Sequence, residues 1–175
     1  MRALAAAVFA GVLVVGCSPQ PQGLDCGDPT TLVPHPNQAD FTGAPLGPLL
    51  VRNFREGETT AIIDVYSPGY ATKVVIVAAR SFDTPLTLRG WRCSDRTPLR
   101  FAWAYPFATN STPAPSAVFA AAGEEAPVIQ PMTIPASGVY SPAAPAYFLF
   151  ASSGKWLLEV RDGNAVIGQA VLLVR

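Results

Sequence analysis

The segment that decides the fold is residues 147–175, which read YFLFASSGKWLLEVRDGNAVIGQAVLLVR. Apolar side chains recur at every second position in Trp156, Leu158 and Val160, which is the period of a strand with one buried face. An Asp-Gly-Asn turn follows, and Gly and Asn tolerate the positive φ angles of tight hairpin turns. We therefore predict a terminal β-hairpin. The inward positions predicted for its second strand, 165–174, are Val166, Ala170, Leu172 and Val174.

The rest of the chain alternates short apolar runs with turn residues. The 18 prolines and 14 glycines lie between β-branched runs, which favours strands joined by loops over helices. We expect a central strand over 72–82 and a β-bulge at Gly90. The other strands predicted ahead of the terminal hairpin are 49–54, 59–66, 86–93, 99–105, 128–134 and 147–150. This pattern predicts an all-β fold, an immunoglobulin-like antiparallel β-sandwich of about seven strands with long Pro-rich loops.

The chain begins with the pattern of an export signal. Arg2 precedes an uncharged apolar run over 3–15, shorter than the roughly 20 residues that span a bilayer as a helix. The residues VVGC at 14–17 resemble the lipobox of bacterial lipoproteins. This resemblance implies cleavage before Cys17 and acylation of that cysteine, palmitate included. The alternatives are a signal peptide cut elsewhere or a short N-terminal anchor.

These patterns divide the chain into three parts. Residues 1–16 are the predicted lipoprotein signal peptide, 17–48 the lipidated Cys17 with a linker and an irregular N-terminal arm, and 49–175 the β-sandwich domain. Several acyl chains on one cysteine would hold the protein on a membrane permanently. We therefore expect an extracytoplasmic, lipid-anchored protein. Its expected partners are the membrane, reached through that lipid, and an unknown envelope protein or polymer.

Two further cysteines remain, Cys26 and Cys93. An even pair in an oxidising compartment predicts a disulfide, which would fasten the N-terminal arm to the sheet. The alternatives are two reduced, buried thiols or a metal site. Two separated cysteines and one distant histidine are a poor ligand set, so we expect neither a metal nor another cofactor.

The charges argue against nucleic acid as a partner, because the formal net charge is zero and only 14% of residues are charged. Cations nevertheless gather in the middle of the chain. On one face they could meet anionic lipid headgroups, a cell-wall polymer or an acidic protein. The alternative is that they pair with nearby acids, and Trp91 among them is either a core residue or an exposed binding aromatic. The cations of this candidate anionic-partner patch are Lys73, Arg80, Arg89, Arg92, Arg96 and Arg100.

Catalytic motifs are missing from the sequence, so we expect no enzyme activity. His35 is the only histidine and lies between two prolines, in what we expect to be an exposed loop. A general base would need a pocket and an orienting partner. The sequence contains no Gly-x-Ser-x-Gly elbow, His-Glu-x-x-His motif or phosphate-binding loop.

Three segments carry a resemblance to a known group of proteins. They are KVVIVAAR (73–80), PLTLRGWRCSDRTPLRFAW (85–103) and SSGKWLLEVRDGNAVIGQAVLLV (152–174). In this order they resemble uncharacterised bacterial lipoproteins with an immunoglobulin-like β-sandwich domain, whose last hairpin carries Gly-x-Trp. The same pattern resembles small periplasmic sandwich domains related to copper-handling proteins. Copper binding would require ligands besides His35, and the mature chain offers Met132.

Two functions of different classes follow. The favoured one is a membrane-anchored extracytoplasmic lipoprotein that acts as a non-catalytic binding or accessory module of the cell envelope. The alternative is an envelope protein that binds a small ligand or copper. A concave, aromatic-lined pocket, or reduced cysteines beside His35, would favour the alternative, and a flat patch would favour the first.

Overall fold

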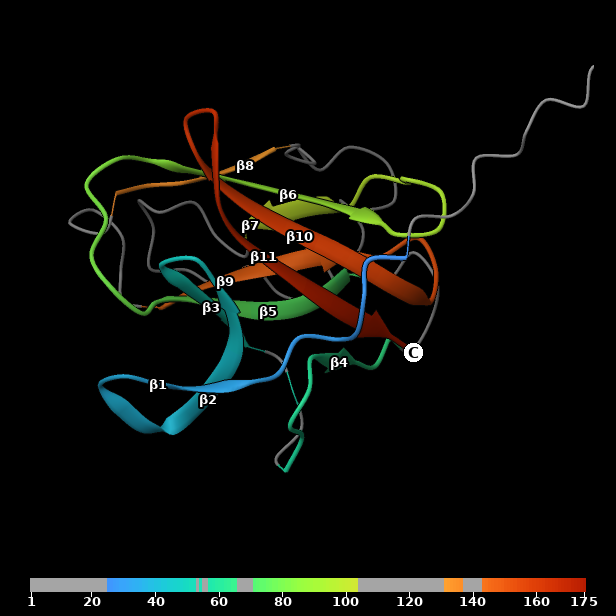
Figure 1. The fold of residues 1–175 in the computed structure, drawn as a ribbon, viewed down its shortest axis with the longest axis horizontal. Coiled ribbons are helices and arrows are strands. Elements are labelled where there is room, and N and C mark those ends of the chain that lie inside the picture. Colours follow the sequence, from blue (N-terminus) through green and yellow to red (C-terminus); the bar gives the residue numbers. More distant parts are fainter. Residues whose placement is uncertain (1–24, 53, 55–56, 66–70, 104–130, 137–142) are drawn as a thin grey trace, which may run out of the picture.

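A computed structural model describes residues 25–52, 54, 57–65, 71–103, 131–136 and 143–175 of the chain. These residues form strands in two largely antiparallel sheets and contain no helix (Figure 1). Within them, therefore, no helix is long and apolar enough to cross a membrane. The predicted all-β sandwich class is confirmed, with more strands than the expected seven or so.

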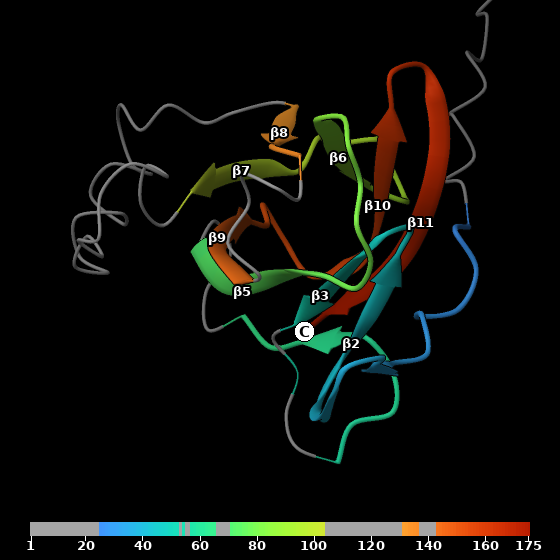
Figure 2. The same ribbon diagram turned by 90° about the vertical axis from the view of Figure 1, so that its left-hand side faces the viewer.

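One sheet has six strands in the order β1-β2-β3-β5-β9-β7, and the other has five in the order β4-β11-β10-β6-β8. Figure 2 shows the two sheets from the side. The strands of the first sheet are β1 (Val33–His35), β2 (Gln38–Leu46), β3 (Leu49–Arg52), β5 (Ala71–Ala78), β7 (Arg100–Trp103) and β9 (Ala143–Leu149). Those of the second are β4 (Ile62–Ile63), β6 (Leu86–Arg92), β8 (Met132–Ile134), β10 (Gly154–Asp162) and β11 (Ala165–Val174).

The predicted terminal hairpin is present as β10 and β11, which pair antiparallel along their whole length. Gly163 has a φ of 55° in the turn, a conformation that side-chain-bearing residues rarely adopt. Trp156, Leu158 and Val160 are all fully buried, as the alternating pattern predicts.

The second strand of this hairpin contains an irregularity that the sequence pattern did not reveal. Val160 pairs with Gly168 and Arg161 with Val166, so Ile167 is an extra residue in β11. Because of the extra residue, side chains on the two sides of the bulge follow opposite alternations, so Val166 faces away from the core. Val166 is therefore 45% exposed, and its predicted inward position is wrong, whereas the other three inward positions of this strand are confirmed as buried.

The core between the sheets is built around an aromatic chain. Phe101 meets Phe148 edge to face with ring centroids 5.1 Å apart, and Phe150 meets Trp156 at 5.3 Å. All four side chains are fully buried. The Trp156 indole Nε1–H donates to the carbonyl of Ser152 at 3.1 Å, so burial leaves no polar group of this side chain unpaired.

The sandwich begins earlier than the sequence predicts. Residues 33–46, assigned above to an irregular arm, form β1 and β2, and Ala44 and Leu46 are fully buried in the core. Figure 1 shows these strands as a hairpin at the lower left. Three prolines in this region suggested irregular structure, but β1 lies at the edge of its sheet, where proline costs little pairing.

The expected β-bulge at Gly90 is absent. The pairing of β6 with β10 runs without a shift from Leu86 to Arg92. Glycine is needed at position 90 for space instead, because an added Cβ would lie 2.9 Å from Leu99 Cδ2 and 3.0 Å from Leu158 Cδ2. The central strand predicted over 72–82 is present as β5, which lies between β3 and β9, but it ends at Ala78, so residues 79–82 are not part of it.

The turn between β2 and β3 crosses β11 at very short range. A Cβ on Gly168 would lie 2.1 Å from the backbone nitrogen of Gly47. A Cβ on Gly47 would in turn meet the carbonyl of Ile167 at 2.9 Å. The two glycines therefore allow strands from different sheets to touch through their backbones.

Candidate ligand-binding site

The six cations of the predicted patch are distributed over both sheets. Lys73 lies on β5 and Arg100 on β7, both in the six-stranded sheet. Arg89 and Arg92 lie on β6, in the five-stranded sheet. The remaining two, Arg80 and Arg96, follow β5 and β6 respectively. A single basic face formed by all six is therefore not present, and each cation must be judged by its own neighbours.

Arg92 is neutralised within the protein. Its guanidinium forms a two-pronged ion pair with Asp95, with Arg92 Nε 2.8 Å from Asp95 Oδ1, and also donates to the hydroxyl of Ser152. Asp95 Oδ1 further accepts the backbone N–H of Thr97 at 3.0 Å. These bonds, chiefly those from Arg92, hold the pKa of Asp95 well below its usual range. They tie the turn after β6 to the loop before β10.

Arg96 lies in this same turn and is held over an aromatic ring. Its φ is +64°, the one positive value found for a non-glycine residue in the described chain. Its guanidinium carbon lies 5.2 Å from the centre of the Trp91 ring, a cation–π distance. Trp91 is half-buried on the outer face of β6, and its Nε1 is buried with no hydrogen-bond partner among the described residues. The ring surface, rather than the indole N–H, therefore supports Arg96.

A pocket of about 400 Å³ opens over this part of β6. It is a hollow wide open to solvent, neither an enclosed cavity nor a flat patch. Its volume lies within the range of small-molecule sites. The described residues that line it are Arg89, Gly90, Trp91, Arg96, Pro98 and Pro131.

Arg89 faces a carboxylate that other residues already occupy. Glu159 lies opposite Arg89 in the β6–β10 pairing. Its Oε1 accepts from Arg161 Nε at 2.5 Å and its Oε2 from Gln169 Nε2 at 3.1 Å. Glu159 is only 5% exposed, so its charge is satisfied locally by these two donors. Arg89 is exposed and has no ion pair with any residue that the structure describes.

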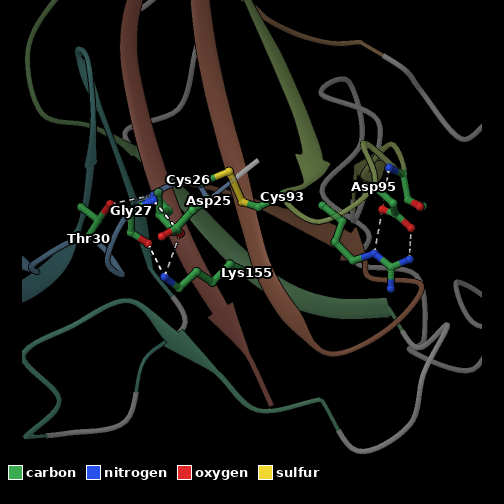
Figure 3. Close-up of a disulfide and its surroundings, with 10 residues drawn as sticks. Asp25, Cys26, Gly27, Thr30, Cys93, Asp95 and Lys155 are labelled. Atoms are coloured by element: carbon green, nitrogen blue, oxygen red, sulfur yellow. Dashed lines mark hydrogen bonds and ion pairs between the residues drawn. A yellow bond between two sulfur atoms is a disulfide. The ribbon is translucent and has the colours of Figure 1, made fainter. Parts of the chain in front are cut away.

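The predicted disulfide Cys26–Cys93 is present, with Cα atoms 5.7 Å apart (Figure 3). Next to it, Lys155 Nζ donates to the carbonyl of Gly27 at 2.6 Å and pairs with Asp25 at 3.2 Å. The hydrogen bond from Lys155 also lowers the pKa of Asp25. The arm is thus fastened to the five-stranded sheet, as predicted. Cys17 and the predicted signal peptide lie outside the described residues.

The arm continues past the disulfide to the edge of β11. The backbone N–H of Thr30 donates to the carbonyl of Val171 at 2.9 Å, and the N–H of Val171 donates to Thr30 Oγ1 at 2.7 Å. Val171 is 7% exposed although it faces outward on the sheet. The arm therefore crosses from the end of β6 to β11 and covers this end of the sheet.

His35 has a structural environment, in β1 rather than in the exposed loop that we expected. It is 7% exposed; Nδ1 accepts the N–H of Asn37 at 3.1 Å, and Nε2 lies 3.2 Å from the carbonyl of Ala78. Met132, the other copper ligand considered, is fully buried in β8 of the opposite sheet. Among the described residues, no three His, Cys, Asp or Glu side chains cluster as metal ligands would.

A second hollow of about 480 Å³ lies between the loop after β5 and the β10–β11 turn. Arg80 lines it together with Asp83 and Asp162, and Thr84 Oγ1 donates to Asp162 Oδ1 at 2.9 Å. Acids and a base are mixed here. This hollow therefore lacks the uniform charge of the pocket over β6.

Comparison with known proteins adds information on the fold. No family model matches the chain, and no curated protein matches it. A solved structure described as the "X-ray Crystal Structure of a Putative Lipoprotein from Bacillus anthracis" is similar, with a TM-score of 0.51 and 11% sequence identity. The similarity covers 85% of this chain and 86% of that one. At this identity it supports the sandwich fold alone.

Arg89 and Arg96 are among the candidate cations named from the sequence. The sequence did not predict which residues occupy the carboxylates that lie near them. No local pattern in the sequence indicates that Gln169 reaches Glu159 from the next strand. Pro131, the residue before β8, lines the pocket although it lies 35 residues after Arg96 in the sequence. The one local signal was the closeness of Trp91 to Arg96 in the sequence.

Proposed function

We propose that this protein is a membrane-anchored extracytoplasmic lipoprotein that acts as a non-catalytic binding module of the cell envelope. The lipobox-like residues ending at Cys17 support the anchor. The Cys26–Cys93 disulfide supports an oxidising compartment outside the cytoplasm. The similarity of fold to a Bacillus anthracis protein described as a lipoprotein agrees with this assignment.

The disulfide also relates the proposed anchor to the sandwich. Cys26 comes nine residues after Cys17. A chain of this length reaches at most about 30 Å when fully extended. A lipid on Cys17 would therefore keep the end of the five-stranded sheet that carries Cys93 close to the membrane surface.

The observation that carries the binding role is the pocket over β6, lined by Arg89, Trp91 and Arg96. A concave site with an aromatic wall favours a small ligand over a flat partner surface. The second candidate function, a small-ligand-binding envelope protein, is therefore the form of binding module that we favour. The copper version of that candidate has no support, since the cysteines are joined and His35 is engaged with backbone groups.

The anchor is tested by comparing Cys17→Ala with the neighbouring Ser18→Ala in the native host. We expect the wild type and Ser18→Ala to incorporate a clickable palmitate analogue and to sediment with membranes. Cys17→Ala should lose the label, and should either appear in the soluble fraction or keep its signal peptide. A labelled, membrane-bound Cys17→Ala protein would disprove lipidation at this residue.

The binding role is tested by crosslinking in intact cells, followed by mass spectrometry of the purified protein. We expect an adduct with an envelope component in near-stoichiometric amounts. Only unadducted protein, over the full range of crosslinker concentration, would contradict the accessory role in its broad form.

A further inference from the structure

Two arginines in the pocket carry charge that the described protein does not neutralise. The nearest carboxylates in sequence and in strand register are Asp95 and Glu159. Asp95 is engaged by Arg92, and Glu159 by Arg161 and Gln169. Neither Arg89 nor Arg96 forms an ion pair with any described residue. The pocket is therefore a site of positive charge whose donors are available to a ligand.

The fold holds Arg96 in an unfavourable backbone conformation with a positive φ. A side-chain-bearing residue in the left-handed region is strained relative to one in the right-handed region. Such strain persists where the surroundings impose it, and it is concentrated at functional sites. Here the Arg92–Asp95 pair and the Thr97–Asp95 bond close the turn, and the Trp91 ring supports the guanidinium.

The ligand chemistry follows from the number and type of donors. One arginine commonly binds both oxygens of a carboxylate, whereas a phosphate has further oxygens for a second guanidinium. A pocket of about 400 Å³ has room beyond the anion itself. Pro98 and Pro131 offer carbon surface there to the organic part of the ligand.

We infer that Arg89 and Arg96 together bind the phosphate group of a phosphate ester in this pocket. The inference deepens the proposed binding function by naming the ligand class. Two sources share this chemistry, a soluble phosphate ester and the headgroup of an anionic phospholipid. The second is within reach because Cys93, next to the pocket in sequence, is tied to the arm that leads towards Cys17.

The test is isothermal titration calorimetry on the full chain in an uncharged polyoxyethylene detergent. The probes are glucose 6-phosphate as a soluble ester, glycerophosphoglycerol as a headgroup without acyl chains, glucuronate as a carboxylate and glucose as a neutral sugar. We expect one of the two phosphate probes to bind at least about tenfold more tightly than glucuronate and glucose. The tighter of the two phosphate probes identifies the source.

Matched variants assign the binding to the pocket. Arg89→Gln and Arg96→Gln should each weaken the phosphate probe at least about tenfold, as loss of one charge-assisted hydrogen bond predicts. Arg100→Gln, on the opposite sheet, should leave it unchanged. Arg96→Gly is the second variant at that position, because glycine accepts the positive φ and removes the cation without strain.

Three results would overturn the inference: glucuronate binding as tightly as the phosphate probes, no phosphate probe binding better than glucose, or full binding in the Arg89 and Arg96 variants. None of these results would bear on the proposed lipid anchor, which the Cys17→Ala experiment tests separately. Crosslinking to an envelope component could also still succeed through another surface.

Discussion

At the scale of single residues, two carboxylates determine which arginines remain available. Asp95 binds Arg92 and the N–H of Thr97, and so closes the turn that carries Arg96. Glu159 binds donors from its own strand and the next one. Each acid thereby satisfies its charge without the arginines of the pocket. The positive charge of the pocket therefore depends on which residues Asp95 and Glu159 bind, as well as on the presence of its arginines.

The Asp95 carboxyl should give the stability a measurable pH dependence. Its pKa is lowered in the folded protein, chiefly by Arg92, whereas an aspartate in the unfolded chain titrates near about 3.9. The stabilisation is therefore complete above about pH 5 and is lost as the pH falls below about 4 towards the folded-state pKa.

We expect the free energy of unfolding of Asp95→Asn, measured in urea, to lie below that of the wild type at about pH 6. This gap should narrow as the pH falls from about 4 towards about 2, because the Asp95 carboxylate is protonated in the unfolded chain at these pH values but not in the folded protein. Arg92→Gln removes the principal partner and should abolish the same pH-dependent part. A gap that stays constant with pH would show that the ion pair contributes no stability.

At the scale of elements, β11 joins the two sheets through its bulge. Ile167 is the extra residue. Gly168, directly after it, lies against the backbone of Gly47 in the β2–β3 turn. The bulge reorients the strand, and the missing side chain lets the turn approach. Without both features the turn could not lie against β11 in this way.

Gly168→Ala should therefore destabilise the protein by about 3 kcal/mol or more, at or above the upper end of ordinary overpacking. The reason is that the new Cβ would lie 2.1 Å from backbone rather than from a movable side chain. Val166→Ala is the control on the same strand, where the side chain is 45% exposed and a change within about 0.5 kcal/mol is expected. Urea unfolding measures both. A small effect of Gly168→Ala would show that the turn moves away freely.

At the scale of the whole molecule, the N-terminal arm lies between the proposed anchor and the proposed ligand site. The disulfide, the Lys155 contacts and the Thr30–Val171 bonds fasten it across one end of the five-stranded sheet. Trp91, which lines the pocket, lies two residues before Cys93 in the sequence. An anchor and a ligand site joined in this way would present the pocket towards the membrane surface.

The double variant Cys26→Ser/Cys93→Ser should lose about 4 kcal/mol of stability, because the bond closes a long loop in the unfolded chain. The cysteines are 67 residues apart, which places the loop in this range. Urea unfolding of the variant measures the loss, and wild-type protein unfolded with a reductant should match it. A difference below about 1 kcal/mol in the free energy of unfolding would mean that the disulfide adds little stability beyond the other contacts of the arm.

Features that depend on neighbouring residues or on simple pairing could be predicted from the sequence alone. The 156–174 hairpin follows from a period of two and a turn sequence, and both are local. The partnership of Cys26 and Cys93 follows from their even number in a chain that is predicted to be exported. The interpretation of Trp91 stayed open, because a half-buried strand residue satisfies both alternatives.

Which cations remain without an ion pair among the described residues depends on contacts in the tertiary structure. Arg89 and Arg92 lie three residues apart on β6, yet Arg92 is neutralised by Asp95 whereas Arg89 faces an acid that Arg161 and Gln169 occupy. The start of the sandwich at β1 and the phase change in β11 were decided in the same way. Strand register brings together side chains from distant parts of the chain. A one-residue bulge or an edge position changes those contacts without altering any local pattern.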